Sequence, residues 1–477
     1  MKYITVVFFF ISFLQLLSSS AADKLVVYNA PQGALLNADF LIKVRQLGKE
    51  WKTIPNHLVK VDEVEDTRHN VKEASMAYFD FSGSVEVSVT YNRGGIDAAK
   101  IRPLSYGIQP IVKGNTLTFR LDKPSNLSVE INGNIFNNLH LFANPLVESI
   151  PDRRDPDVIY FGPGIHEFKD QVFKVASGKT VYIAGDAILR GQLLVHDADD
   201  VKIIGRGMVE HTVKMGVHIA NSRNVLVDGI FTTQCATGGS DNVTIRNVKS
   251  ISYYGWGDGL NVFASSNVYF DRVFCRNSDD CTTVYATRKG FTGGSNNVVM
   301  ENSTLWADVA HPIFIGIHGN TESPDIIENL IYRNIDILDH KEAQINYQGC
   351  LSINAGDNNL VRNVRFEDIR VEDFRQGQLV NLRVFYNEKY CKAPGRGIEN
   401  IVFKNVSYTG VNSEVSVISG YNEDRKIKNV VFENLKINGE IIHDDMDQKP
   451  KWYNTGDMAR VFISNHVENI RFIKTQP

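Results

Sequence analysis

The stretch NVYFDRV (267–273) is one of nine copies of a short repeat in the second half of the chain. Each copy begins with Asn, and apolar and polar residues then alternate, which is the period of a β-strand. Copies start 18 to 40 residues apart, which is typical of a solenoid whose loops vary in length. The other copies are NVLVDGI at 224, NVTIRNV at 242, NVVMENS at 297, NLIYRNI at 329, NVRFEDI at 363, NIVFKNV at 400, NVVFENL at 429 and NIRF at 469.

Short stacked strands with a turn residue at a fixed place describe a parallel β-helix. The leading Asn tolerates the left-handed backbone that begins such a strand, and Asn residues of neighbouring coils can stack in a ladder. An antiparallel β-sandwich would instead need hairpin signals such as Asn-Gly between the runs, and few are present. We therefore predict an all-β protein with a right-handed parallel β-helix over residues 151–477.

Residues 23–150 lack the Asn repeat. Alternating runs such as SVEVSVTY (84–91) and NTLTFRL (115–121), separated by turn-rich pieces, predict the strands of antiparallel sheets. We expect a small N-terminal β-sandwich that ends near the polar stretch ESIPDRRDPD (148–157). Because the first coil of a solenoid must be covered to keep its core dry, the sandwich could help to cap the β-helix.

The first 22 residues have the pattern of a secretory signal peptide. Lys2 precedes an apolar run from Ile4 to Leu17, and small residues follow up to Ala22, where Ser20-x-Ala22 suits signal peptidase. An uncleaved membrane anchor is the alternative. No later stretch approaches the roughly 18 apolar residues of a membrane-spanning helix. We expect an exported protein, extracellular or periplasmic, that is not membrane-bound after cleavage.

The composition excludes several classes of protein. A net charge of −4 over 477 residues, without a basic stripe, gives no sign of binding to nucleic acid or anionic lipid. Five cysteines are few and odd in number; Cys275 and Cys281 could pair, or all five could be buried thiols. No Cys or His spacing suggests a metal cage, so we expect no metal and no cofactor, and a monomer.

Three aspartates carry the chemistry that the sequence suggests. Asp258 lies in GWGDGLN (255–261), and Asp279 and Asp280 lie in NSDDC (277–281), 21 and 22 residues later. That gap is about one coil, so the carboxylates would crowd together on neighbouring strands about 4.8 Å apart. Crowded carboxylates separate their pKa values, which supplies the acid and the base that glycosidic hydrolysis needs. Singly, each could be an ordinary turn Asp; their spacing within one helix favours catalysis.

The segment DGLNVFASSNVYFDRVFCRNSDDC (258–281) resembles the polygalacturonase clan of glycosidases. The clan comprises glycoside hydrolase family 28, the polygalacturonases, and family 49, the dextranases and isopullulanases. A sandwich before the helix and LWADVAHPIFIGIHGN (305–320) after the Asp pair look more like family 49. Trp256 and Gly257 stand where polygalacturonases usually carry Asn and Thr, and their Arg-Ile-Lys is missing. The resemblance therefore implies the catalytic class but not pectin as the substrate.

By this resemblance, Asp279 matches the general acid, and Asp258 and Asp280 match the pair that orients and deprotonates the attacking water. The expected reaction is inverting hydrolysis of a polysaccharide, dextranase-like or polygalacturonase-like, with attack inside the chain. A β-helix polysaccharide lyase with Ca²⁺ at the aspartates and a non-catalytic carbohydrate-binding protein are the alternatives. Candidate substrate-binding residues, each with a structural alternative, are His311, His318, Trp256, Tyr285, Arg288 and Lys289.

Overall fold

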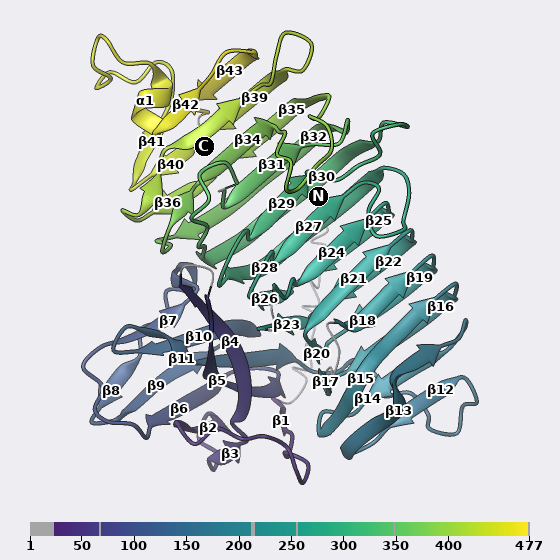
Figure 1. Ribbon diagram of the computed structural model, residues 1–477. Helices are drawn as coiled ribbons and strands as arrows, with labels where there is room; N and C mark the ends of the chain where they lie inside the picture. The colour runs from purple at the N-terminus through teal and green to yellow at the C-terminus, as the bar shows by residue number, and fades with distance from the viewer. Residues whose placement is uncertain (1–22, 66–67, 211–214, 254–255, 348, 476–477) are drawn as a thin grey trace, which may run out of the picture.

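The computed structural model describes residues 23–65, 68–210, 215–253, 256–347 and 349–475. Two parts follow one another along the chain: two small sheets of strands β1 to β11, then a long coil of strands β12 to β43 (Figure 1). The signal-peptide prediction concerns residues 1–22, which lie outside the described residues. No helix within the described residues has the length and apolar character needed to cross a membrane.

The N-terminal part is a pair of sheets that enclose one apolar core. All pairings inside the sheets are antiparallel except β5 with β11, which run parallel. The six-stranded sheet contains β1 (Leu25–Val27), β4 (His57–Glu65), β5 (Arg68–Phe81), β7 (Ala99–Arg102), β10 (Ser125–Ile131) and β11 (Asn134–Pro145). The five-stranded sheet contains β2 (Phe40–Gln46), β3 (Lys52–Ile54), β6 (Val85–Tyr91), β8 (Ile111–Lys113) and β9 (Thr116–Leu121), and a 3₁₀ turn spans Leu104–Tyr106.

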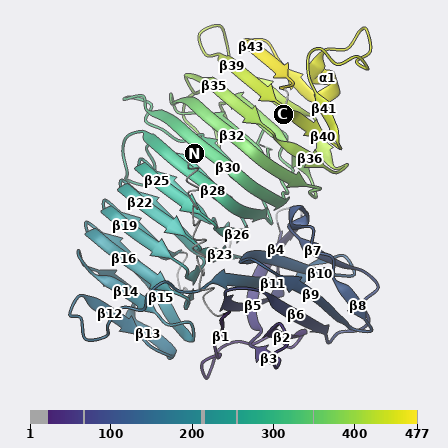
Figure 2. The ribbon, with the colours of Figure 1, turned by 180° about the vertical axis from the view of Figure 1, so that it is seen from behind.

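The rest of the chain coils into a parallel β-helix with three faces (Figures 1 and 2). The first face carries the Asn repeats: β12 (Val158–Phe161), β14 (Thr180–Ile183), β16 (Asp199–Gly205), β19 (Arg223–Asp228), β22 (Asp241–Arg246), β25 (Ser266–Asp271), β28 (Ser295–Ala307), β30 (Ile326–Asp339), β32 (Leu360–Glu372), β35 (Gly397–Lys404), β39 (Ile427–Glu433) and β43 (Val467–Ile473). The long strands β28, β30 and β32 continue onto the second face.

The second face is completed by β13 (Gly164–Val175), β15 (Ala187–His196), β17 (Met208–Glu210), β20 (Phe231–Thr232), β23 (Lys249–Ile251), β26 (Phe274–Asn277), β36 (Ser407–Thr409), β40 (Leu435–Ile437) and β41 (Glu440–Ile442). The third face contains the ends of β13 and β15 and then β18 (Met215–Ala220), β21 (Gln234–Gly238), β24 (Leu260–Phe263), β27 (Thr282–Tyr285), β29 (Ile313–Gly316), β31 (Leu351–Ala355), β34 (Val380–Val384), β38 (Ser416–Ser419) and β42 (Val461–Ile463). A separate pair, β33 (Gly377–Gln378) and β37 (Ser413–Glu414), and the helix α1 (Thr455–Ala459) complete the chain.

The repeat Asn residues form the expected ladder. Asn363 has a left-handed backbone with φ of 56°. Its side-chain amide donates to Asn329 at 3.1 Å, and its oxygen accepts from Asn400 at 3.0 Å. The same geometry recurs from coil to coil, so each Asn both turns the chain into a strand and links two coils. The prediction of a parallel β-helix behind a small sandwich is confirmed.

The interior of the β-helix is apolar and continuous from coil to coil. Aromatic rings stack within it, as Phe366, Phe403 and Phe432 do at 4.9 and 4.7 Å between ring centroids. All five cysteines are buried free thiols, so the alternative of a Cys275–Cys281 disulfide is wrong. At these positions Cys serves as a small apolar side chain.

The sandwich packs against the second face of the β-helix, beside the coils that carry the aspartates (Figure 1). Phe231 and Phe274 of the β-helix contact Phe142 of the sandwich, with ring centroids 5.6 and 5.0 Å apart. Buried ion pairs accompany the apolar contact, such as Arg206 with Asp80 at 3.0 Å. The boundary between the two parts thus combines apolar, aromatic and ionic contacts.

Prediction for the ladder: we expect Asn363→Ala to lower the free energy of unfolding by about 2 kcal/mol, because Ala disfavours a left-handed backbone and cannot replace the ladder bonds. Asn363→Gly is the matched control, since Gly accepts this backbone conformation but also lacks the bonds, and its cost should be clearly smaller. Chemical denaturation measures both. Equal losses for Ala and Gly would show that the left-handed conformation contributes nothing.

Candidate active site

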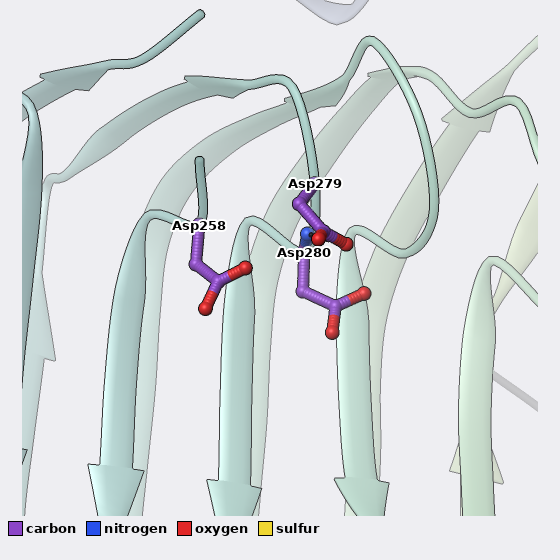
Figure 3. A group of neighbouring side chains, drawn as sticks. All are labelled: Asp258, Asp279 and Asp280. Carbon is purple, nitrogen blue, oxygen red and sulfur yellow. Dashed lines mark hydrogen bonds between the residues drawn. The ribbon is translucent and has the colours of Figure 1, made fainter. Parts of the chain in front are cut away.

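The three aspartates lie at the corner between the second and third faces, just before β24 and β27 (Figure 3). Leu260 pairs with Thr282, which places Asp258 and Asp280 opposite each other two residues earlier. The ladder of backbone hydrogen bonds reaches this point, because the N–H of Gly259 donates to the carbonyl of Asp280 at 2.9 Å. Parallel register therefore fixes the side-by-side placement that the sequence spacing predicted.

Close packing holds this corner in shape. A Cβ on Gly259 would come within 2.4 Å of the side chain of Asn277 and of the Cys281 carbonyl, so only Gly fits after Asp258. The buried Asn277 amide donates to the hydroxyls of Ser250 at 3.1 Å and Ser252 at 2.8 Å. These contacts link the segment before Asp258 to the segment before Asp279.

The carboxylates of Asp258, Asp279 and Asp280 each offer an oxygen within 4.8 Å of the others. Burial, and then repulsion from Asp258 and Asp280, raise the pKa of Asp279 well above its ordinary value. One hydrogen bond, from the N–H of Asp280 at 3.0 Å, opposes this rise only in part. The surroundings of Asp279 thus favour the protonated form of its carboxyl.

Asp258 is held by two amide donors. The side chain of Asn261 donates to its carboxylate at 2.7 Å and that of Gln234 at 3.2 Å. These two hydrogen bonds fix the position of the Asp258 carboxylate beside Asp279 and Asp280.

Asp280 is enclosed by three donors. The backbone N–H of His311 donates to it at 3.1 Å, the Nδ1 of the same ring lies 2.6 Å away, and the hydroxyl of Tyr285 donates at 3.2 Å. The Nε2 of His311 lies 2.5 Å from the carbonyl oxygen of Tyr347, so both ring nitrogens face acceptors and the doubly protonated ring satisfies both. Burial would lower the pKa of His311, but the charge and hydrogen bond of Asp280 outweigh it and raise that pKa.

Two residues that were predicted to bind substrate, His311 and Tyr285, are buried beside Asp280 instead of exposed next to the carboxylates. His311 is fully buried and supports Asp280. Tyr285 is 8% exposed, and its ring packs against Phe263, Phe314 and His318, so it has no open face for a sugar. The prediction that Tyr285 stacks on a sugar ring is corrected here, because its side chain points along the apolar outer surface of the third face.

Of the remaining candidates, Trp256, Arg288 and Lys289 are exposed and His318 is buried. Trp256 is 45% exposed, and its ring edge meets His69 of the sandwich at 4.8 Å. Arg288 and Lys289 are exposed in a turn after β27. Burial, followed by the charges of Arg288 and Lys289, lowers the pKa of His318 to about 3, so His318 is neutral.

The hairpin of β4 and β5 reaches from the sandwich to this corner. Asp62 of the hairpin bonds through its N–H to Asp308 at 3.5 Å, and its carboxylate lies 2.5 Å from His69. Val64 packs against Val309 and Ala310, directly before His311. The sandwich therefore forms one wall beside the carboxylates.

Sequence reasoning missed the polar residues that position the aspartates: Gln234, Asn261 and Asn277. Gln234 lies 24 residues before Asp258, about one coil, so its place in the same row was readable from the spacing. Asn277 precedes the Asp pair in NSDDC but points inward, and no periodicity in the sequence encodes that direction.

The cluster also has the donor set of a cation site, since hard cations such as Ca²⁺ prefer several carboxylate oxygens at close range. A cation would need Asp279 ionised, whereas its surroundings favour the protonated form. Because a bound cation would itself offset the repulsion among the carboxylates, the donor set suits a general acid and a cation site alike, and the sensitivity of activity to EDTA separates the two.

The fold and the site together define a parallel β-helix protein with three clustered carboxylates at an outer corner, one of which has a raised pKa. Residues 193–451, more than half of the chain, match the family described as glycosyl hydrolases family 28. The chain belongs to this family.

Named relatives agree with this assignment. The probable endo-xylogalacturonan hydrolase A of Aspergillus fumigatus is 28% identical over 170 residues, 35% of this chain and 38% of that protein. The probable endopolygalacturonase D of Neosartorya fischeri is 24% identical over 225 residues, 46% of this chain and 43% of that protein. The chain spans less than half the length of these two relatives. Dex49A from Penicillium minioluteum has a TM-score of 0.62 at 12% identity, covers 93% of this chain and 96% of its own, and shows the same fold.

Prediction for the support of Asp280: we expect His311→Phe to lower kcat/KM by roughly 10- to 100-fold, since one hydrogen bond to a charged group is removed. The loss should be largest at acidic pH, where the raised pKa of His311 keeps the wild-type ring doubly protonated and donating to Asp280. His311→Asn, which can still donate, should restore part of the activity. A uniform loss at all pH values in both variants would mean that His311 is only a packing residue.

Proposed function

We propose that the protein is a secreted glycoside hydrolase that cleaves a polysaccharide within its chain, with inversion at the anomeric carbon. The observation that supports it most is the raised pKa of Asp279 between two carboxylates that have donors of their own. Export is proposed from the sequence pattern of residues 1–22 alone.

In this mechanism Asp279 gives its proton to the glycosidic oxygen as the C–O bond to the anomeric carbon breaks. Asp258 and Asp280, which lie opposite each other before neighbouring strands, bind the attacking water between them. One of them takes the proton that the water loses as the new C–O bond forms, and the donors around each carboxylate hold it in place.

Inversion does not follow from the usual distance rule. The oxygens of the cluster lie within 4.8 Å of one another, less than the roughly 6.5–9.5 Å between the acid and the base of most inverting enzymes. We infer inversion because two carboxylates are available to hold one water. A retaining mechanism, with a covalent glycosyl-enzyme intermediate, would use one carboxylate as nucleophile and one as acid, and would leave the third without a role. This makes the product configuration an informative measurement.

The substrate class is inferred from the relatives, whose names refer to xylogalacturonan and polygalacturonan. The exposed cations Arg288 and Lys289, on the same side of the third face as His318, would suit an acidic sugar. A galacturonan is therefore the first polymer to test, and dextran is the neutral comparison.

Prediction for the reaction: incubation with polygalacturonate, xylogalacturonan and dextran should release reducing ends from at least one polymer. Proton NMR in the first minutes should show the inverted anomer. Retention would contradict the roles given to Asp258 and Asp280, and no release from any polymer would contradict the proposed function.

Asp279→Asn is the control for the acid, since the amide cannot supply a proton. Its turnover should fall at least about 100-fold, while its unfolding midpoint stays near that of the wild type. Activity should also survive EDTA without a rise in ultraviolet absorbance. An unsaturated product whose formation EDTA blocks would identify a calcium-dependent lyase instead.

A further inference from the structure

Three exposed aromatic side chains lie together at the C-terminal end of the β-helix. Trp452, Tyr453 and Phe462 are 87%, 52% and 58% exposed. With Val415, Asp457 and Arg460 they line a depression of about 580 Å³. Trp452 buries so little of its ring that the fold gains almost nothing from it, and clustered exposed apolar surface usually marks a binding site.

This depression lies on the edge of the third face that carries the carboxylates. In Figure 1 that face runs from β18 through β24 and β27 to β42 beside α1. Five steps from one strand to the next, here called rungs, separate Asp280 from the start of β42. At the spacing of neighbouring strands this distance is about 24 Å. The residues of this row are, in order, Asp280, His311, Gly349, Gln378, Glu414 and Ala459, and Arg460 follows directly.

Aromatic side chains also occur between the two ends. The ring of Tyr347 lies 4.6 Å from that of His311, and Tyr390 stacks on Tyr347 at 4.6 Å. Tyr386, on the loop that follows β34, is 44% exposed. Aromatic side chains are thus present on the coils that separate the carboxylates from the terminal depression.

We propose that the depression at Trp452, Tyr453 and Phe462 is a distal sugar-binding site for the same polysaccharide chain that is cleaved at Asp279. This inference rests on the proposed function. Sugar rings carry C–H groups on one face and hydroxyls at the edge, so aromatic planes can pack against the face. The exposed side chains of Asp457 and Arg460 can exchange hydrogen bonds with the hydroxyls. A chain held here would remain bound while a bond five rungs away is cut.

The test measures binding separately from cleavage. In the inactive Asp279→Asn background, electrophoresis through gels that contain polygalacturonate, xylogalacturonan or dextran reports binding to each polymer. We expect retardation by at least one polymer, and Trp452→Ala should weaken that binding about 3- to 10-fold, the range for one aromatic contact. Trp51→Ala is the matched control, because Trp51 is a partly exposed Trp on the sandwich, and it should bind as the background does.

A kinetic comparison completes the test. In the active protein, Trp452→Ala should raise KM for the polymer without changing kcat. It should also leave kcat/KM unchanged for a trisaccharide, which is too short to span five rungs. The proposal is overturned by unaltered binding in Trp452→Ala, by no retardation in any gel, or by equal losses on polymer and trisaccharide. It is also overturned if wild-type protein sediments as a dimer that Trp452→Ala dissociates, since the patch would then contact a second copy. Failure of the proposed function would give a different result, because wild-type protein would then release no reducing ends from any polymer.

Discussion

The active-site corner depends on one constraint, the parallel register between β24, β27 and β29. Backbone hydrogen bonds place Asp258, Asp280 and His311 in one row, and neighbouring strands leave only about 4.8 Å between them. At that spacing, burial and the repulsion from its two neighbours raise the pKa of Asp279 well above its ordinary value. The apolar interior of the β-helix and the Asn ladder help to maintain this register, because both link each coil to the next.

The sandwich has a part in the site as well as in the fold. Its apolar contact with Phe231 and Phe274 covers the second face just before the carboxylate corner. The β4–β5 hairpin then extends along the corner and touches Trp256 through His69. Burial at this corner strengthens the repulsion that raises the pKa of Asp279. A β-helix without the sandwich would expose the same carboxylates to more water.

Much of this was readable from the sequence. The Asn repeat predicts the β-helix because its period matches strands and its turn residue recurs, and the spacing of Asp258 and Asp280 equals one coil. The burial of His311 and Tyr285 was not readable, because positions at the ends of short strands give no period that separates buried from exposed residues. The parallel pairing of β5 with β11 was also missed, because it joins segments far apart in the chain and leaves no local signal.

The most direct measurement is a pH titration of the Asp279 carboxyl carbon by ¹³C NMR, in the wild type and in Asp258→Asn. Repulsion between crowded carboxylates predicts that the pKa of Asp279 lies well above its ordinary value and falls when the charge of Asp258 is removed. An Asp279 pKa near 4, roughly that of a free aspartate, or one that does not respond to Asp258→Asn, would contradict the account.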